Sequence, residues 1–241
     1  MKDQYFGDVN DYRKYGLLRA LIEGAQVRLG VCWLRTTNDG SRDGERRQYL
    51  RQPARWRGYD PDLYDALRRL LAPRVERTVV HAEAWELLPR ARYHHEFLGD
   101  ASSERQSYFA SAWQRLRDTP LLFLDPDKGL EVPSVAYGRR TSASYLYWHE
   151  VDEAYRLGHS LVLYQHFRRT KRGPFVTTLT DSLRRRLAGC RVESFRSASA
   201  VYLVAARPEH AASLQRGCDL VRHRWQRQIQ CTRGDKPVTS P

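Results

Sequence analysis

The sequence predicts an α/β fold in which helices cover both faces of a mostly parallel sheet and an antiparallel β-hairpin closes the C-terminal end. Short apolar runs alternate with stretches whose apolar residues recur at helical spacing. Near the C-terminus, two apolar segments, 191–195 and 200–206, are separated only by a turn, as in a hairpin. The 241 residues show neither repeats nor a linker, so we expect one domain over 1–231 and a disordered tail over 232–241.

Periodicity and turn residues predict the elements of the N-terminal half. Asp11 is expected to cap the first helix, and Gly24 to end it. The strand that follows runs into a loop with the turn sequence Asn38-Asp39-Gly40, where a Rossmann-like fold has the glycine loop of its first nucleotide-binding unit. The expected elements are a helix over 12–23, a strand over 27–34, a helix over 60–71, a strand over 77–81 and a helix over 104–118.

The central strand of the predicted sheet is the apolar run 121–124, which suits a strand buried on both faces. It stops at Asp125-Pro126-Asp127-Lys128-Gly129, where the proline ends the ladder and the glycine permits a tight turn. Because ligands of open α/β sheets bind at the carboxyl ends of the strands, Asp125 and Asp127 are candidate site residues. The alternative is an Asp-Pro turn followed by a solvated lysine.

Strands and helices continue to alternate after this loop. A strand over 160–166 ends in His166, which is a candidate general base at the same edge of the sheet. A histidine at a strand end is alternatively a hydrogen-bonded packing residue. The remaining expected elements are a helix over 181–187, the hairpin strands 191–195 and 200–206, and a final helix over 210–227.

Charge is the unusual feature of the composition. The chain carries 41 Lys and Arg against 28 Asp and Glu, a formal net charge of +13, and only five of the basic residues are lysines. Arginine matches phosphate geometry and stacks on bases, so nucleic acid, RNA or DNA, is the expected partner. The alternative is a genome whose base composition replaces lysine by arginine.

Other signals point to a cytoplasmic protein. No apolar segment approaches the ~20 residues of a membrane span, and the opening residues do not resemble a signal peptide. The four cysteines lack metal-ligand spacing, so we expect free thiols in a reducing compartment and no structural zinc site; they are Cys32, Cys190, Cys218 and Cys231. The sequence does not indicate an oligomeric state.

Two segments carry a resemblance to a known family. Residues 7–18, Gly-Asp-Val-Asn-Asp-Tyr-Arg-Lys-Tyr-Gly-Leu-Leu, resemble the opening of ribosomal RNA adenine-N6 methyltransferases and of the three-Cys-motif partner proteins. Residues 122–127, Leu-Phe-Leu-Asp-Pro-Asp, are similar to the Asp-Pro-Pro-aromatic motif of amino methyltransferases, without its second proline and aromatic residue. With the order of elements, this resembles the class I S-adenosylmethionine-dependent methyltransferase fold.

The resemblance implies a methyltransferase-like enzyme that acts on nucleic acid or a nucleic-acid-associated substrate, with S-adenosylmethionine as cofactor and no metal. It implies that Asp125 and the Pro126 carbonyl hold the target amine, beside Asp127 and His166 as further catalytic candidates. We also expect the segment 7–15 to lie over the carboxyl edge of the sheet. The implied cofactor-binding residues are Gly7, Asp8, Lys14, Asn38, Asp39, Gly40 and Glu83.

Two alternative functions remain open. A magnesium-dependent nuclease or phosphoesterase on the same scaffold would gather carboxylates at one sheet edge beside phosphate-binding arginines. Such a site needs Asp125 to converge with Asp127 or Asp39, whereas a methyltransferase needs one carboxylate. The third candidate is a non-catalytic nucleic-acid-binding partner protein. The acidic residues available for a Mg²⁺ site are Asp39, Asp43, Asp125, Asp127 and Glu131.

Overall fold

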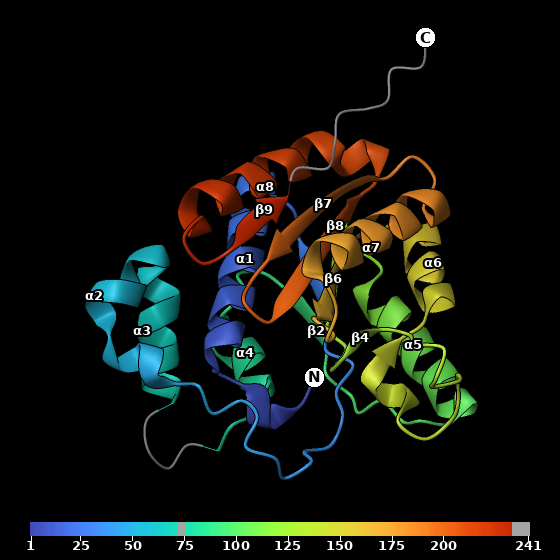
Figure 1. Ribbon diagram of the computed structural model, residues 1–241, viewed down its shortest axis with the longest axis horizontal. Helices are drawn as coiled ribbons and strands as arrows, with labels where there is room; N and C mark the ends of the chain where they lie inside the picture. Colours follow the sequence, from blue (N-terminus) through green and yellow to red (C-terminus); the bar gives the residue numbers. More distant parts are fainter. Residues whose placement is uncertain (72–75, 233–241) are drawn as a thin grey trace.

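The computed structural model describes residues 1–71 and 76–232 and confirms the predicted α/β fold (Figure 1). Seven strands form the main sheet in the order β2-β1-β3-β6-β8-β7-β9. Neighbours among β2, β1, β3 and β6 are parallel, whereas β8 is antiparallel to both β6 and β7. The strands are β1 (Leu29–Cys32), β2 (Arg92–His94), β3 (Leu121–Leu124), β6 (Ser160–His166), β7 (Arg191–Arg196), β8 (Ala200–Ala206) and β9 (Gln230–Thr232).

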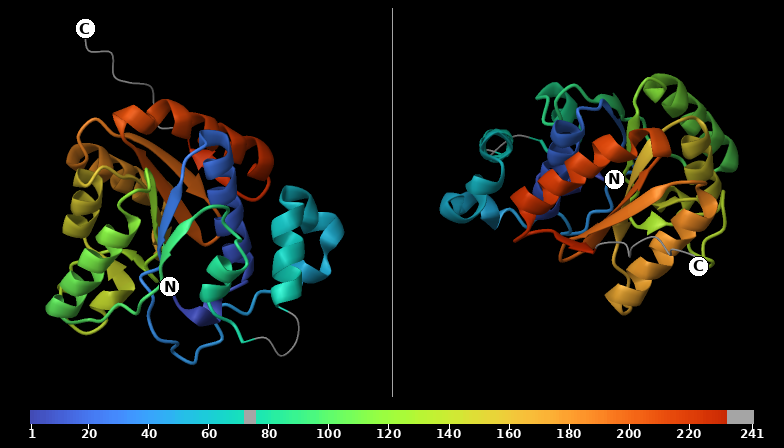
Figure 2. Two further views of the ribbon diagram at one scale, coloured as in Figure 1. Left: turned by 180° about the vertical axis from the view of Figure 1, so that it is seen from behind. Right: turned by 90° about the horizontal axis from the view of Figure 1, so that it is seen from above.

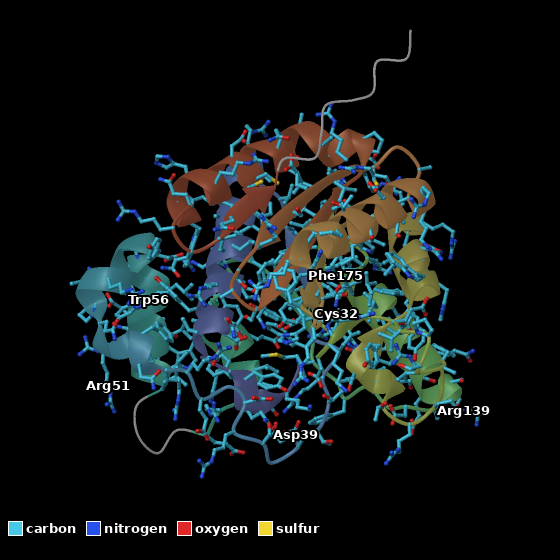
Figure 3. The ribbon with its side chains drawn as sticks, in the orientation of Figure 1. Cys32, Asp39, Arg51, Trp56, Arg139 and Phe175 are labelled. Atoms are coloured by element: carbon cyan, nitrogen blue, oxygen red, sulfur yellow. The ribbon has the colours of Figure 1, made fainter. Side chains whose placement is uncertain are left out.

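Helices cover both faces of this sheet, as the two further views show (Figure 2). One face packs against α1, α4 and α8, and the other against α5, α6 and α7. α3 packs against α1 on its side away from the sheet, next to the short helix α2 that carries Trp56 (Figure 3). A separate pair of short parallel strands, β4 (Gly129–Leu130) and β5 (Tyr145–Leu146), follows the central strand. The helices are α1 (Val9–Ala25), α2 (Pro53–Trp56), α3 (Pro61–Leu70), α4 (Val80–Ala84), α5 (Ser102–Leu116), α6 (Trp148–Arg156), α7 (Arg172–Arg186) and α8 (Ala211–Trp225).

The apolar run 121–124 forms β3, the third strand of the sheet, and is buried on both faces, as predicted. Leu121 and Phe123 pack into the core on the α1 side, and Leu122 and Leu124 pack into the core on the α5 side. This double burial explains the absence of polar residues from the strand. It also places residue 125 at the edge where the parallel strands β1, β3 and β6 all end.

The first helix is longer than predicted at both ends. Asp8 is its N-cap and accepts a hydrogen bond from the backbone N–H of Asn10, so the prediction of Asp11 as N-cap is wrong. Gly24 lies inside α1 and does not end it. A Cβ at Gly24 would lie 2.8 Å from the backbone oxygen of Arg216 in α8, so this glycine lets the two helices approach closely.

Two further predictions are corrected by tertiary contacts. The segment 77–81 is not a strand, because α4 begins at Val80. Just before this helix, the Asp3 carboxylate accepts hydrogen bonds from the Thr78 hydroxyl and the Val79 N–H, so a distant residue stabilises its start. Thr232 belongs to β9, where it pairs with Ser194, and not to a tail. The rest of the predicted tail, 233–241, lies outside the described residues.

Within 1–71 and 76–232, none of the helices combines the length and the apolar character that crossing a membrane requires.

Candidate functional site

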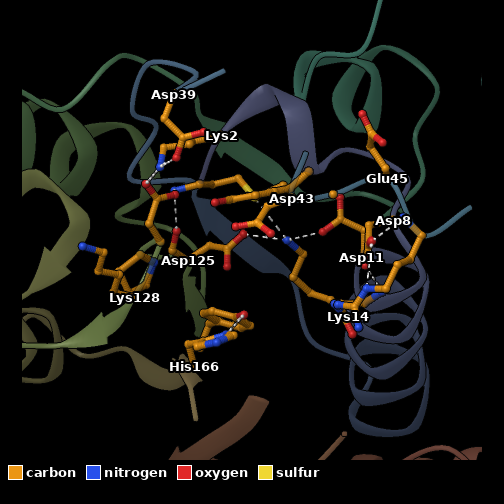
Figure 4. Close-up of a pocket in the computed structure, with 18 of the residues that line it drawn as sticks. Lys2, Asp8, Asp11, Lys14, Asp39, Asp43, Glu45, Asp125, Lys128 and His166 are labelled. Atoms are coloured by element: carbon orange, nitrogen blue, oxygen red, sulfur yellow. Dashed lines mark hydrogen bonds and ion pairs between the residues drawn. The ribbon is translucent and has the colours of Figure 1, made fainter. Parts of the chain in front are cut away.

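A cavity of about 490 Å³ opens at the carboxyl edge of the sheet (Figure 4). Its walls come from the first turns of α1, the loop 39–46, the loop after β3, and side chains of β6 and β8. This volume suits a small organic ligand. Although the protein has a formal net charge of +13, seven lining residues are acidic: Asp8, Asp11, Asp39, Asp43, Glu45, Asp125 and Asp127.

The loop 125–129 is held in one shape by Gln165 of β6. The side-chain oxygen of Gln165 accepts from the Leu130 N–H at 2.8 Å, and its amide nitrogen donates to the Lys128 carbonyl at 3.1 Å. Gly129 has φ of +104°, and a Cβ there would lie 2.4 Å from the Gln165 side chain. The loop therefore requires a glycine at 129, and β6 fixes its position relative to β3.

A buried ion cluster joins this loop to α1. Lys14 Nζ lies 2.7 Å from Asp125 Oδ2 and 2.8 Å from Asp11 Oδ1, and both carboxylates are almost fully buried. Asp11 also accepts from the Gly7 N–H at 3.1 Å through its other oxygen. The expectation that the segment 7–15 faces the site is confirmed, because Asp8, Asp11 and Lys14 line the cavity.

Burial and charge act against each other on the pKa values of this cluster. Burial raises the pKa of the Asp11 carboxyl to about 6, although Lys14 opposes the shift. Burial alone would lower the pKa of Lys14, but the carboxylates of Asp11 and Asp125 together raise it above its usual value. The two carboxylates therefore favour the charged form of Lys14, and its ammonium group lies against Asp125 Oδ2.

Two acceptors at the cavity wall remain available to a ligand. Asp125 Oδ2 is engaged by Lys14, but within the described residues nothing donates to Asp125 Oδ1. Pro126 lines the same cavity, and its carbonyl likewise accepts no hydrogen bond from the described part of the chain. These adjacent acceptors belong to a rigid turn, so they suit a ligand that presents N–H or O–H donors.

Asp127 is committed to the N-terminal segment. Its Oδ1 lies 2.8 Å from the amino group of Met1, and its Oδ2 accepts from the Thr36 hydroxyl at 2.6 Å and lies 3.3 Å from Lys2 Nζ. Burial would raise the pKa of Asp127, but the Met1 amino group, Thr36 and Lys2 together lower it. Asp127 therefore serves to bind the N-terminal segment to the loop after β3.

The other residues predicted from the sequence divide into two groups. Asp8, Asp39 and His166 line the cavity with Lys14, Asp125 and Asp127. Asp39 binds Lys2 at 2.9 Å, and a backbone hydrogen bond from Ser41 together with Lys2 lowers its pKa. His166 lies exposed at the rim, where partial burial of its ring lowers its pKa, and its Nδ1 is 3.5 Å from the Tyr164 hydroxyl.

Four candidates are not brought into the cavity wall: Gly7, Asn38, Gly40 and Glu83. The Gly7 carbonyl accepts from the Tyr49 hydroxyl, and Asn38 accepts from the backbone N–H of Gln4. Glu83 lies 3.0 Å from His95, on another part of the molecule. These residues therefore make local structural contacts, and the cavity wall is built from other side chains.

Sequence reasoning missed the aromatic part of the wall. Tyr164 and Tyr202 face each other across β6 and β8 and both line the cavity. The Tyr202 side chain is fully buried, and its hydroxyl has no hydrogen-bond partner among the described residues. Burial is the largest cause that raises the pKa of Tyr202 well above its usual value, and the nearby Asp125 and Asp11 carboxylates raise it further. No local signal in β8 separates Tyr202 from an ordinary core residue.

The carboxylates do not form a metal site. Within the described residues, no group of three or more His, Cys, Asp or Glu side chains has the arrangement needed to hold a metal ion. Asp125 is bound to Lys14, and Asp127 to the Met1 amino group and Lys2, so their nearest partners are cations. A Mg²⁺ ion held by both Asp125 Oδ2 and Asp127 would have to displace these cations, and Asp125 Oδ1 alone is one ligand of the several oxygens that Mg²⁺ requires.

Comparison of the sequence with models of known protein families gave no match, and a search of curated proteins gave none either.

Proposed function

We propose that the protein is a methyltransferase-like enzyme that uses S-adenosylmethionine and acts on an amine of a nucleic acid or a nucleic-acid-associated substrate. The observation that carries this proposal is the pair of open acceptors, Asp125 Oδ1 and the Pro126 carbonyl, at the carboxyl end of β3. The fold supports it by analogy, because a mostly parallel sheet with a reversed strand is also the scaffold of the class I methyltransferases.

The chemical character of the cavity fits the proposed cofactor. S-adenosylmethionine carries a positive sulfonium, a positive amino group and a carboxylate, and the cavity lining offers both signs of charge, with seven acidic and five basic residues. The ribose hydroxyls are donors that carboxylates bind in other nucleotide sites. Asp39 takes this role in the proposal, because it lines the cavity and its side chain is exposed. Asp8 also lines the cavity, but it is buried and its oxygens accept hydrogen bonds from the backbone N–H groups of Asn10 and Arg46.

The residues of the chain would act mainly by alignment. When bound, the cofactor supplies a methyl group that is electrophilic because it is attached to a sulfonium. Asp125 Oδ1 and the Pro126 carbonyl accept the two N–H bonds of the target amine, which directs the nitrogen lone pair away from them. Lys14 holds the Asp125 carboxylate through Oδ2, so the acceptor geometry is set before the substrate arrives.

This proposal is favoured over a magnesium-dependent nuclease. A metal enzyme requires Asp125 to converge with Asp127 or Asp39 on one cation. Instead, Lys14 binds Asp125, the Met1 amino group binds Asp127, and Lys2 binds Asp39. The nucleic-acid substrate and a cytoplasmic location belong to the proposal and rest on composition. The four cysteines form no disulfide within the described residues, which agrees with a reducing compartment.

Binding and turnover of an Asp125 variant test the proposal. We expect calorimetry to show S-adenosylmethionine binding, with a Kd that Asp125→Asn changes less than about threefold. Transfer of a radiolabelled methyl group to RNA or DNA should fall about 10- to 100-fold, the value of a hydrogen bond to a charged group. Asp118→Asn is the matched control, because Asp118 is an exposed residue paired with Arg92 and should leave both measurements unchanged.

Two results would contradict the proposal. Wild-type protein that does not bind S-adenosylmethionine would exclude this cofactor. If Mg²⁺ binds instead, and both Asp125→Asn and Asp127→Asn abolish its binding together with nuclease activity, then the metal-dependent reading is correct.

A further inference from the structure

One surface segment beside the cavity is strongly basic. The chain leaves β6 at His166 and begins α7 at Arg172, and the connection reads Phe-Arg-Arg-Thr-Lys. We call the residues Arg168, Arg169, Lys171 and Arg172 the basic loop. All four side chains are exposed, and the sequence contains no Asp or Glu from Phe167 to Thr180. No described carboxylate forms an ion pair with any of the four, so their charge is not compensated locally.

Two of these arginines hold the loop in place. Arg168 donates to the Leu130 and Glu131 carbonyls at 3.3 Å, and its guanidinium lies over the Phe175 ring. Arg172 donates to the Ala198 carbonyl at 2.8 Å and lies over the Phe167 ring. The loop is therefore fixed against the body of the protein by backbone carbonyls and aromatic rings. Because these partners are uncharged, they do not neutralise the two guanidinium groups.

The other two side chains of the basic loop have no polar partner among the described residues. The side chains of Arg169 and Lys171 make no polar contact with any residue in the described part of the chain, whereas the Lys171 carbonyl accepts from the Phe175 N–H at the start of α7. A cation on a fixed loop, without a protein partner, is available to an anionic ligand. α7 adds to this field, because its first turn contains no acidic residue to compensate the positive end of the helix.

The basic loop directly follows a residue of the cavity wall. His166, the last residue of β6, lines the cavity, as does Lys128, whose carbonyl is bound by Gln165 of the same strand. Arg169 is three residues beyond His166, which limits its backbone to about 10 Å from that residue. A ligand that enters the cavity and continues past His166 therefore meets the basic loop next.

We propose that the basic loop binds the phosphate backbone of a nucleic-acid strand whose target nucleotide enters the cavity. This rests on the proposed function for the nucleotide itself, while the loop is a separate surface with its own measurable affinity. Arginine-rich surfaces suit phosphates, which guanidinium groups bind in bidentate geometry. An anionic membrane is less favoured, because the exposed large apolar side chains are Trp85, Phe97 and Leu157, and none lies in the loop.

A matched pair of double variants tests this surface. Arg169→Gln/Lys171→Gln removes two exposed charges that have no described polar partner. Arg68→Gln/Arg69→Gln removes two exposed charges from α3, far along the chain from the cavity wall, and lowers the net charge equally. Because no described residue makes a polar contact with the side chains of either pair, both proteins should remain folded, and circular dichroism verifies this.

The measurement is fluorescence anisotropy with a labelled 20-nucleotide single strand, as RNA and as DNA of the same sequence, from 50 to 200 mM salt. We expect the basic-loop variant to bind about tenfold more weakly at 100 mM salt and to reduce the salt slope by about 1.4, since each phosphate contact on a single strand contributes about 0.7. The α3 variant should change the affinity less than threefold. The RNA and DNA arms show which strand is preferred.

Three results would overturn the proposal: no binding of either strand at 50 mM salt, equal losses in the two double variants, or charge-dependent binding to phosphatidylserine vesicles without binding to either strand. S-adenosylmethionine binding is measured separately on the same proteins. Arg169 and Lys171 do not line the cavity, so the basic-loop variant should bind this cofactor as the wild type does. Strand binding at the loop without cofactor binding would reject the proposed enzyme and leave the basic loop as a nucleic-acid surface.

Discussion

Two buried ion clusters in this protein differ in what surrounds them. Arg105 of α5 and Glu150 of α6 form an enclosed pair, with the guanidinium donating to both carboxylate oxygens and to the Ser142 and Tyr145 carbonyls. The Lys14 cluster borders a cavity and leaves Asp125 Oδ1 without a described donor. Burial of charge is common to both, so burial alone does not identify a site. An acceptor left open beside a cavity separates the second cluster from the first.

The enclosed pair joins separate segments of the chain. The Arg105 side chain also lies over the rings of Tyr137 and Tyr147, at 5.4 and 4.9 Å, so it joins the long loop after β4 to α5. The Arg105 side chain is fully buried and is not part of the cavity wall. The three predictions below test the contrast between an enclosed structural pair and a cluster that faces a cavity.

The largest effect is expected at the enclosed pair. Arg105→Met leaves the Glu150 carboxylate buried without its partner, which costs about 3–5 kcal/mol in the free energy of unfolding. For a protein of this size the Tm should fall by about 10 °C. Arg105→Met/Glu150→Leu should recover most of this loss, because it removes both charges. A loss below about 1 kcal/mol in the single variant, measured by urea denaturation, would contradict the structural role.

A smaller, pH-dependent effect is expected at the cavity cluster. Lys14→Met leaves Asp11 and Asp125 buried together without their cation, which should cost about 2–4 kcal/mol at pH 8. Asp11 has a pKa of about 6 in the folded protein against 3.8 ordinarily, so the stability it contributes is present below 3.8 and is lost as the pH rises through 6. Without Lys14, which lowers this pKa, the dependence should become steeper.

The Lys14→Met loss should therefore shrink clearly at pH 5, where Asp11 is protonated. Urea denaturation of the variant and of the wild-type protein at pH 5, 6.5 and 8 measures this difference. Glu150 also titrates in this range, but it is present in both proteins, so its contribution cancels when the two free energies of unfolding are subtracted. A loss that does not depend on pH would show that the two carboxylates are not coupled through Lys14.

The smallest effect is expected at Tyr202, whose buried hydroxyl has no described partner. Tyr202→Phe should change the free energy of unfolding by less than about 0.5 kcal/mol, because no hydrogen bond is lost. Tyr12→Phe is the matched control: its hydroxyl donates to the Trp56 carbonyl at 2.8 Å, and its removal should cost about 1 kcal/mol. Equal losses in thermal denaturation would show that Tyr202 has a partner in the folded protein.

Much of the fold follows from local sequence. The apolar run 121–124, the strand ending at His166 and the hairpin over 191–206 have periodicities that a half-buried or buried strand imposes directly. The Asp-Pro-Asp-Lys-Gly turn was also predictable, because proline and glycine act on their own backbone. Where prediction failed, at Gly24 and at 77–81, the deciding contacts came from Arg216 of α8 and from Asp3.

The candidate site, like the fold, was predictable from local sequence only in part. Composition and the end of a buried strand were enough to single out Asp125, since the parallel topology carries that position to the carboxyl edge of the sheet. Only the tertiary structure decided which residues surround Asp125. Lys14, 111 residues away in the sequence, binds its carboxylate, and Tyr202 forms part of the cavity wall. Periodicity reports which face of an element is buried, whereas the partner found there depends on how α1 and β8 pack against β3 and β6.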